Sequence, residues 1–151
     1  MIKASDVALF LAPLVLGMGS GWLLLPRKGY VQCGLRPSIQ PPGWVFSVAW
    51  TVLYLLAGAA ASLAWRRAGR RLSRGLVALA VALLALMAWW VIFASRCMPS
   101  VAFAAIVPAA GLVVAAAALL WVDGAKLSAA LLGPLVAWMA FASLLSFLSI
   151  P

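Results

Sequence analysis

Long stretches without a charged side chain constrain this 151-residue chain more than any other feature. There are five such stretches, each of 20 residues or more: 7–26, 37–65, 75–95, 97–122 and 127–151. A helix needs about 20 mostly apolar residues to cross a bilayer. The sequence therefore predicts an all-α fold, an integral membrane bundle of five transmembrane helices in a single domain over 1–151. The expected helices span 7–25, 44–65, 75–95, 100–122 and 127–150, with a long loop at 26–43.

The amino-acid composition supports this interpretation. Hydrophobic residues make up 68% of the chain and charged residues 9%, whereas soluble domains have about 45–50% apolar and about 25% charged residues. So few polar side chains cannot cover a soluble surface, and we expect the lipid bilayer to be the main partner. A transmembrane β-barrel would show alternating polar and apolar residues, and the run from Leu76 to Met87 does not alternate.

The ionisable side chains exclude several kinds of chemistry. The chain has two acids, Asp6 and Asp123, and no histidine. It lacks the residues for paired-carboxylate catalysis, for a His-dependent triad and for a His-ligated metal or haem. We therefore predict no catalytic residues, no metal site and no required cofactor. A proton-coupled exporter needs an ionisable residue within a span, whereas both acids lie at the ends of predicted helices.

Basic residues predict the orientation of the bundle. Five helices would place the N-terminus, the second loop and the fourth loop on one face, with seven of the 11 Lys and Arg residues. The positive-inside rule then puts the N-terminus and the Arg66–Arg74 loop in the cytoplasm. Basic residues beside spans also attract anionic lipid headgroups. Because no separate basic domain exists, the net charge of +9 does not indicate a nucleic-acid partner.

The second predicted helix carries the best candidate for a site. Trp44 and Trp65 lie at its ends, as interface anchors do. Between them, a stripe at spacings of three and four contains Ser47, Trp50, Thr51, Tyr54, Gly58 and Ser62. Two interpretations stay open: ordinary packing between helices, or a pocket lined by Trp50 and Tyr54. Trp138 in the last helix would be a second pocket residue, because its indole N–H needs a partner.

Residues 36–58 resemble the signature of the TspO/translocator protein family, also called the peripheral-type benzodiazepine receptor or MBR family. That signature reads K-P-x-x-x-P-P-x-W-V-F-x-x-x-W-x-x-L-Y-x-x-x-G, and Arg36 in place of lysine is the only departure. The segment from Leu131 to Trp138 resembles a second family pattern, L-L-x-P-Y-x-A-W, with Leu135 in place of tyrosine. The resemblance implies a five-helix bundle, often a homodimer, in a mitochondrial outer membrane or a bacterial membrane.

The same resemblance implies a cavity within the bundle that opens toward the first loop. Its ligands would be hydrophobic: tetrapyrroles such as protoporphyrin IX and haem, sterols, and benzodiazepine-type drugs. By matched position, the ligand-binding residues would be Phe46, Ser47, Ala49, Trp50, Tyr54, Phe103, Val107, Trp138, Ala142 and Leu145. Arg36 in the first loop would pair with ligand carboxylates.

Departures from the family pattern leave the function open. In the third helix the family has Q-L-x-L-N-x-x-W, whereas residues 81–88 lack both amides and the tryptophan, with Trp89 one position later. Ser146 replaces an asparagine in the fifth helix. One alternative is a binder or translocator of hydrophobic ligands, and a second is a membrane interaction or regulatory protein that keeps the bundle without ligand chemistry. A third is light-dependent tetrapyrrole degradation, which uses tryptophan and needs no acid or histidine.

The two cysteines, Cys33 and Cys97, fall on one face in this topology. A disulfide between them is therefore topologically feasible. Two free thiols are the favoured interpretation, because 64 residues separate the cysteines and no pairing motif links them.

Overall fold

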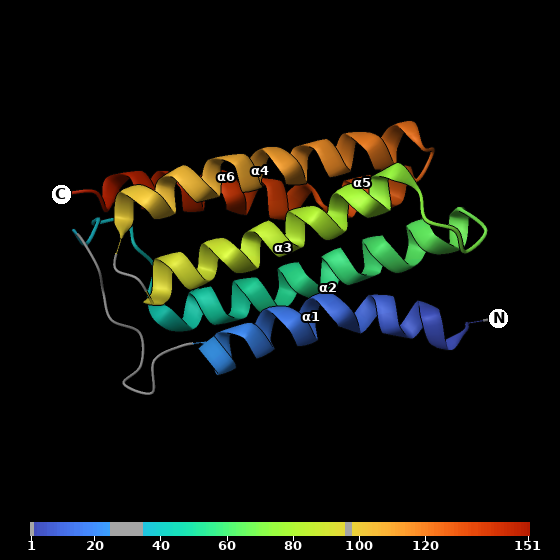
Figure 1. The fold of residues 1–151 in the computed structure, drawn as a ribbon, viewed down its shortest axis with the longest axis horizontal. Helices are drawn as coiled ribbons and strands as arrows, with labels where there is room; N and C mark the ends of the chain where they lie inside the picture. Colours follow the sequence, from blue (N-terminus) through green and yellow to red (C-terminus); the bar gives the residue numbers. More distant parts are fainter. Residues whose placement is uncertain (1, 25–34, 96–97) are drawn as a thin grey trace.

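The computed structural model describes residues 2–24, 35–95 and 98–151 (Figure 1). Its regular structure over these residues is entirely helical, which confirms the expected fold class. The helices are α1 (Ala4–Leu24), α2 (Gly43–Arg67), α3 (Arg74–Ser95), α4 (Pro99–Val122), α5 (Lys126–Leu131) and α6 (Gly133–Leu148).

The helices run along the long axis of a bundle (Figure 1). The helices form a closed ring. Helix α2 packs against α1 on one side and against α5 and α6 on the other, and α5 and α6 pack against α4. Helix α4 packs against α3, and α3 closes the ring by contacting α1. The N-terminus, the α2–α3 connection and the α4–α5 connection lie together at one end, and the C-terminus lies at the other (Figure 1). We call the end that contains the N-terminus and these two connections the basic end. It carries Lys3, Arg66, Arg67, Arg70, Arg71, Arg74 and Lys126.

The outer surface of the bundle matches a bilayer rather than water. Among the described residues, four helical segments are long and apolar enough to cross a membrane: Gly43–Arg67, Arg74–Phe93, Pro99–Val122 and Lys126–Leu148. The described apolar part of α1, Ala4–Ser20, is shorter. In an apolar stretch of 18 residues within each of these segments, only 28–33% is buried inside the bundle. The other residues of these stretches are half-buried or exposed, as expected of apolar helices whose outer faces contact lipid.

Small residues bring the helices close together. In α4 a buried stripe at spacings of three and four consists of Ala102, Ile106, Ala109, Val113, Ala116 and Leu120. Glycine lets α1 and α2 approach further, because a Cβ at Gly58 would overlap the carbonyl oxygen of Phe10. A Cβ at Gly17 would likewise overlap the ring of Tyr54. Such contacts supply the van der Waals packing that holds membrane helices together.

The helix expected at 127–150 is two helices in the structure, separated at Leu132. Pro134 explains the difference, since it has no N–H to donate to the carbonyl of Ala130 and its ring crowds that carbonyl. The chain crosses the break with a tighter turn, in which the N–H of Leu132 donates to the carbonyl three residues earlier, that of Ala129, at 3.1 Å. α6 then begins at Gly133.

Only the second half of the expected 26–43 loop is described. Its residue Leu35 donates a backbone hydrogen bond of 3.0 Å to the carbonyl of Ser149, which fastens the loop to the end of α6. Cys33 and Cys97 lie outside the described residues, so their pairing stays a prediction.

Candidate functional site

Six aromatic side chains from α2, α3 and α6 meet in the interior of the bundle. We call this group the aromatic cluster. Its members are Phe46, Trp50, Tyr54, Trp89, Phe93 and Trp138. Intervals of four residues separate the α2 members, and the same interval separates the two α3 members. Each set therefore lies on one face of its helix.

Trp50 lies at the centre of the cluster and is only 8% exposed. Its ring stacks on Tyr54, with centroids 5.4 Å apart, and contacts Trp89 at 6.2 Å. Trp138 meets it edge-on from α6, at 6.4 Å and 82°. Phe46 in turn contacts the ring of Trp138 edge-on at 5.7 Å. These separations are those of favourable aromatic pairs, so the cluster joins three helices.

The cluster contains polar atoms that the protein leaves unsatisfied. The indole N–H groups of Trp50, Trp89 and Trp138 are buried and have no hydrogen-bond partner within the described part of the chain. A buried donor without a partner costs about 1–3 kcal/mol. The hydroxyl of Ser146, which stands where the family pattern has asparagine, is also buried and unsatisfied. The interior therefore offers donors that a ligand with acceptor atoms would satisfy.

An open apolar groove on the outer surface of the bundle shares one residue with this cluster. Its volume is about 680 Å³, and Trp138 belongs to both the groove and the cluster. The groove lies between α2 and α6, and its wall consists of Pro41, Ala49, Val52, Leu53, Pro134, Ala137, Trp138 and Phe141. Small-molecule sites commonly have volumes of about 300–1,000 Å³.

The predicted ligand-binding residues fall into three groups by burial. Trp50, Tyr54, Ala142 and Leu145 are buried, Phe46, Ala49, Phe103 and Trp138 are half-buried, and Ser47, Val107 and Arg36 are exposed. The structure brings together Phe46, Trp50, Tyr54 and Trp138 in the aromatic cluster and adds Ala49 through the groove.

Three predicted residues lie apart from this site. Val107 is 48% exposed on the outer side of α4, whereas its neighbour Ile106 is fully buried. Phe103 pairs with Phe147, at 5.4 Å between centroids, rather than with the aromatic cluster. The hydroxyl of Ser47 is used within α2, where it donates to the carbonyl of Gly43 at 3.4 Å.

Sequence reasoning left the role of Trp89 open and did not single out Phe93. Trp89 is 3% exposed and stacks on Phe93, with centroids 5.4 Å apart and planes at 26°. The available signal was the position of Trp89, one residue after the tryptophan of the family pattern. The structure shows that this tryptophan still reaches the interior, where it contacts Trp50.

Comparison with known proteins agrees with the fold and the residue pattern. The chain matches the TspO/MBR family over residues 9–149. It is 33% identical to the translocator protein of Sus scrofa over 137 residues, which cover 88% of this chain and 75% of the relative. It is 29% identical to the tryptophan-rich protein TspO of Chlorobaculum tepidum, covering 85% and 82% of the two chains. It is 31% identical to the translocator protein homolog of Schizosaccharomyces pombe, over 90% of this chain and 84% of that relative. The chain therefore belongs to the TspO/MBR family.

Proposed function

We propose that this protein binds hydrophobic ligands within the bundle and translocates them. The candidate ligand classes are tetrapyrroles such as protoporphyrin IX and haem, sterols, and benzodiazepine-type drugs. The observation that carries the proposal is the set of three buried indole N–H groups without an acceptor, those of Trp50, Trp89 and Trp138. Family membership supports the same function.

The chemistry of the cluster favours a flat ligand with acceptor atoms at its edge. Trp50 and Trp138 stand at 82° to each other, so a planar ring that stacks on one is contacted edge-on by the other. Carbonyl or carboxylate oxygens on that ligand would accept from the indole N–H groups. Each such hydrogen bond contributes about 0.5–1.5 kcal/mol, and apolar burial contributes the rest.

The groove between α2 and α6 supports entry from the bilayer. Val52 is 49% exposed in its wall, and Trp138 is the lining residue that the groove shares with the aromatic cluster. A ligand dissolved in lipid would therefore reach the cluster by displacing the side chain of Trp138, without passing through water.

Quenching of tryptophan fluorescence by protoporphyrin IX and by a sterol tests the proposal. Trp138→Phe keeps an aromatic ring and removes one N–H, so we expect the Kd to rise about 2- to 12-fold. Trp121→Phe is the matched control, since Trp121 is 54% exposed at the basic end, away from the cluster. Absence of saturable quenching by both ligands, with the helical circular dichroism intact, would contradict the proposal.

A second candidate is a membrane interaction protein without ligand chemistry. The packing within the cluster favours it, because Trp50 already has three aromatic neighbours. Its signature is a partner captured by crosslinking in the native membrane, with a yield that Trp50→Ala leaves unchanged. The homodimer that the family resemblance implies belongs to the same test, and light scattering of the purified protein measures it.

We also propose that the basic end faces the cytoplasm. Seven basic residues lie there, and cytoplasmic loops carry the excess of Lys and Arg. Labelling of single cysteines placed at Arg71 and at Ser38 with a membrane-impermeant maleimide tests the orientation. Modification at Ser38 alone from outside intact cells supports it, and modification at Arg71 alone contradicts it.

A further inference from the structure

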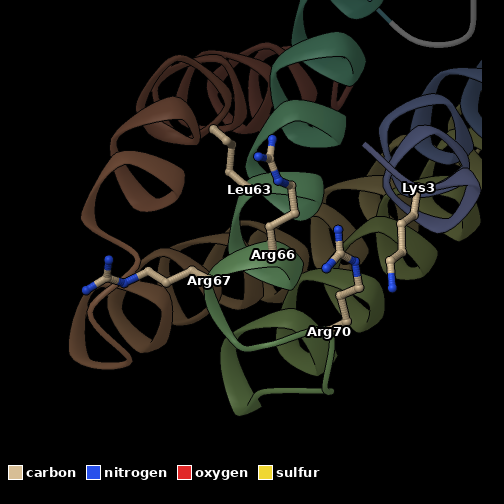
Figure 2. A pocket seen from close by; sticks show the side chains of 5 residues that line it. All are labelled: Lys3, Leu63, Arg66, Arg67 and Arg70. Carbon is tan, nitrogen blue, oxygen red and sulfur yellow. The ribbon is translucent and has the colours of Figure 1, made fainter. Parts of the chain in front are cut away.

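A second cavity lies at the basic end, far along the bundle from the C-terminus, and the proposed function does not use it. Its volume is about 600 Å³. Four basic side chains and one apolar side chain line it: Lys3, Leu63, Arg66, Arg67 and Arg70 (Figure 2). We call it the basic pocket. Because the residue just before α1, residues of α2 and a residue of the α2–α3 connection contribute to it, the pocket exists only in the folded bundle.

Positive charge exceeds negative charge in this pocket. The chain has two acidic side chains, and both lie at the basic end. Asp6 pairs with Arg70 at 3.1 Å, and Asp123 pairs with Arg74 at 3.7 Å. Neither carboxylate forms an ion pair with Lys3, Arg66 or Arg67 within the described part of the chain. Counting the four cations of the pocket against Asp6 leaves a charge of +3.

The backbone holds Arg70 in the pocket. Gly69 and Arg70 both have left-handed conformations, with φ of 64° and 62°. This turn brings the N–H of Arg70 to the carbonyl of Trp65, at 2.8 Å, and closes the end of α2. It also directs the guanidinium toward Asp6 of α1, whose side chain is 2% exposed. The left-handed region is costly for a residue other than glycine, and the ion pair offsets that cost.

Asp6 also fastens the start of α1. Its Oδ2 atom accepts hydrogen bonds from the backbone N–H of Lys3, at 2.9 Å, and from the Nη2 atom of Arg70. Lys3 is therefore held beside Arg70, and Figure 2 shows both side chains directed into the same space. Arg67 points away from them, and its Nη2 atom would lie 3.2 Å from a Cβ at Gly124. The anion contacts would thus come from Lys3, Arg66 and Arg70.

The apolar side of the pocket indicates what kind of anion it fits. Leu63 lies one helical turn before Arg66 and Arg67, on the side of the hydrophobic span (Figure 2). A soluble ion needs only the cations. A phospholipid needs cations at the headgroup and an apolar surface below it for the acyl chains. Arginine suits such a site, because its planar guanidinium binds two phosphate oxygens at once.

We propose that the basic pocket binds the phosphate of an anionic phospholipid, with Arg66, Lys3 and Arg70 at the headgroup and Leu63 against the acyl chain. The bound lipid would join α1 to the end of α2 in the leaflet at the basic end. The proposal is independent of ligand binding in the aromatic cluster, which lies deeper in the bundle.

Native mass spectrometry of the full-length protein tests this with dioleoyl phosphatidic acid and dioleoyl phosphatidylcholine as probes. The measured quantity is the apparent Kd of the first bound lipid. We expect phosphatidic acid to bind more tightly than phosphatidylcholine. Arg66→Gln and Lys3→Gln should each raise the Kd of phosphatidic acid about fivefold, as expected for the loss of one basic residue near an anionic lipid. Arg71→Gln is the matched control: it removes the same charge from an exposed neighbour outside the pocket, and its Kd should stay within about twofold.

Two further arms separate a lipid from a soluble phosphate. Leu63→Ala should weaken the binding of phosphatidic acid, and glycerol 3-phosphate in excess should not displace that lipid. Equal loss with Arg71→Gln and Arg66→Gln would overturn the proposal, since it would show general attraction to the basic end. Displacement by glycerol 3-phosphate, with Leu63→Ala unchanged, would also overturn it and indicate a site for soluble phosphate.

Discussion

Replacing Gly58 with alanine should force helices α1 and α2 apart. A Cβ at this position would overlap the carbonyl oxygen of Phe10 and lie 2.8 Å from its carbonyl carbon. Since carbon atoms in contact are normally about 3.5–4.0 Å apart, relieving the carbon contact alone needs a shift of about 0.7–1.2 Å. The obstacle is helix backbone, so no change of rotamer relieves it.

The size of the effect follows from two terms. Overpacking of this kind typically costs about 1–3 kcal/mol, whereas alanine in place of glycine inside a helix gains about 1 kcal/mol. Gly19→Ala in α1 is the matched control, because a Cβ there meets nothing within 4 Å. Both variants gain the same stability from alanine in a helix, so the difference between their free energies of unfolding measures the cost of the clash at Gly58. That difference corresponds to about 2–12 °C in Tm, at about 2–4 °C per kcal/mol for a chain of this size.

Thermal unfolding in detergent, followed by circular dichroism, measures this difference. We expect Gly58→Ala to melt below both the unmodified protein and Gly19→Ala. If the two alanine variants melt at the same temperature, the close approach of α1 to α2 at Gly58 is refuted, and with it the packing that we describe for this helix pair.

Three other substitutions test local features of the fold. Pro134→Ala restores an N–H that can donate to the carbonyl of Ala130, so α5 and α6 should merge and slow amide exchange should appear across the break; unchanged exchange would refute the role of the proline. Gly124→Ala places a side chain at φ 81° and should cost about 1–2 kcal/mol in the free energy of unfolding; a stability equal to that of the unmodified protein would contradict the left-handed turn. Asp6→Asn removes the charge that pairs with Arg70 and should lower the free energy of unfolding, as measured by denaturant titration; Arg70→Gln in the same background should then add little, and full additivity would show that the two side chains do not interact.

Membrane spans could be located from the chain itself. Helix α2 was expected at 44–65 and is found at Gly43–Arg67, and α4 was expected at 100–122 and is found at Pro99–Val122. The agreement has a local cause: a charged residue marks where a helix leaves the hydrocarbon, and apolar length sets how far it runs. The break at Leu132 depends on how the chain resolves the missing hydrogen bond of Pro134, which can bend a helix or interrupt it.

The candidate site was predictable in part for a similar reason. A period of four places Phe46, Trp50 and Tyr54 on one face, whatever that face contacts. The contribution of α3 could not be found in this way. Trp89 and Trp90 are adjacent, and which of them faces inward depends on the rotation of α3 against α4. In the folded bundle α3 packs on α4 with Trp89 turned against Trp50.

Sequence alone determined that this is a membrane bundle, which helix ends share a face, and that one of those faces is basic. These properties follow from the lengths of apolar runs and from the alternation of direction between successive helices. Tertiary structure alone decided which side chains meet. The ion pair of Asp6 and Arg70 joins residues 64 positions apart, and it requires both the left-handed turn after α2 and the close packing of α1 on α2. No local pattern encodes such a contact, because it depends on the distance and rotation between two helices.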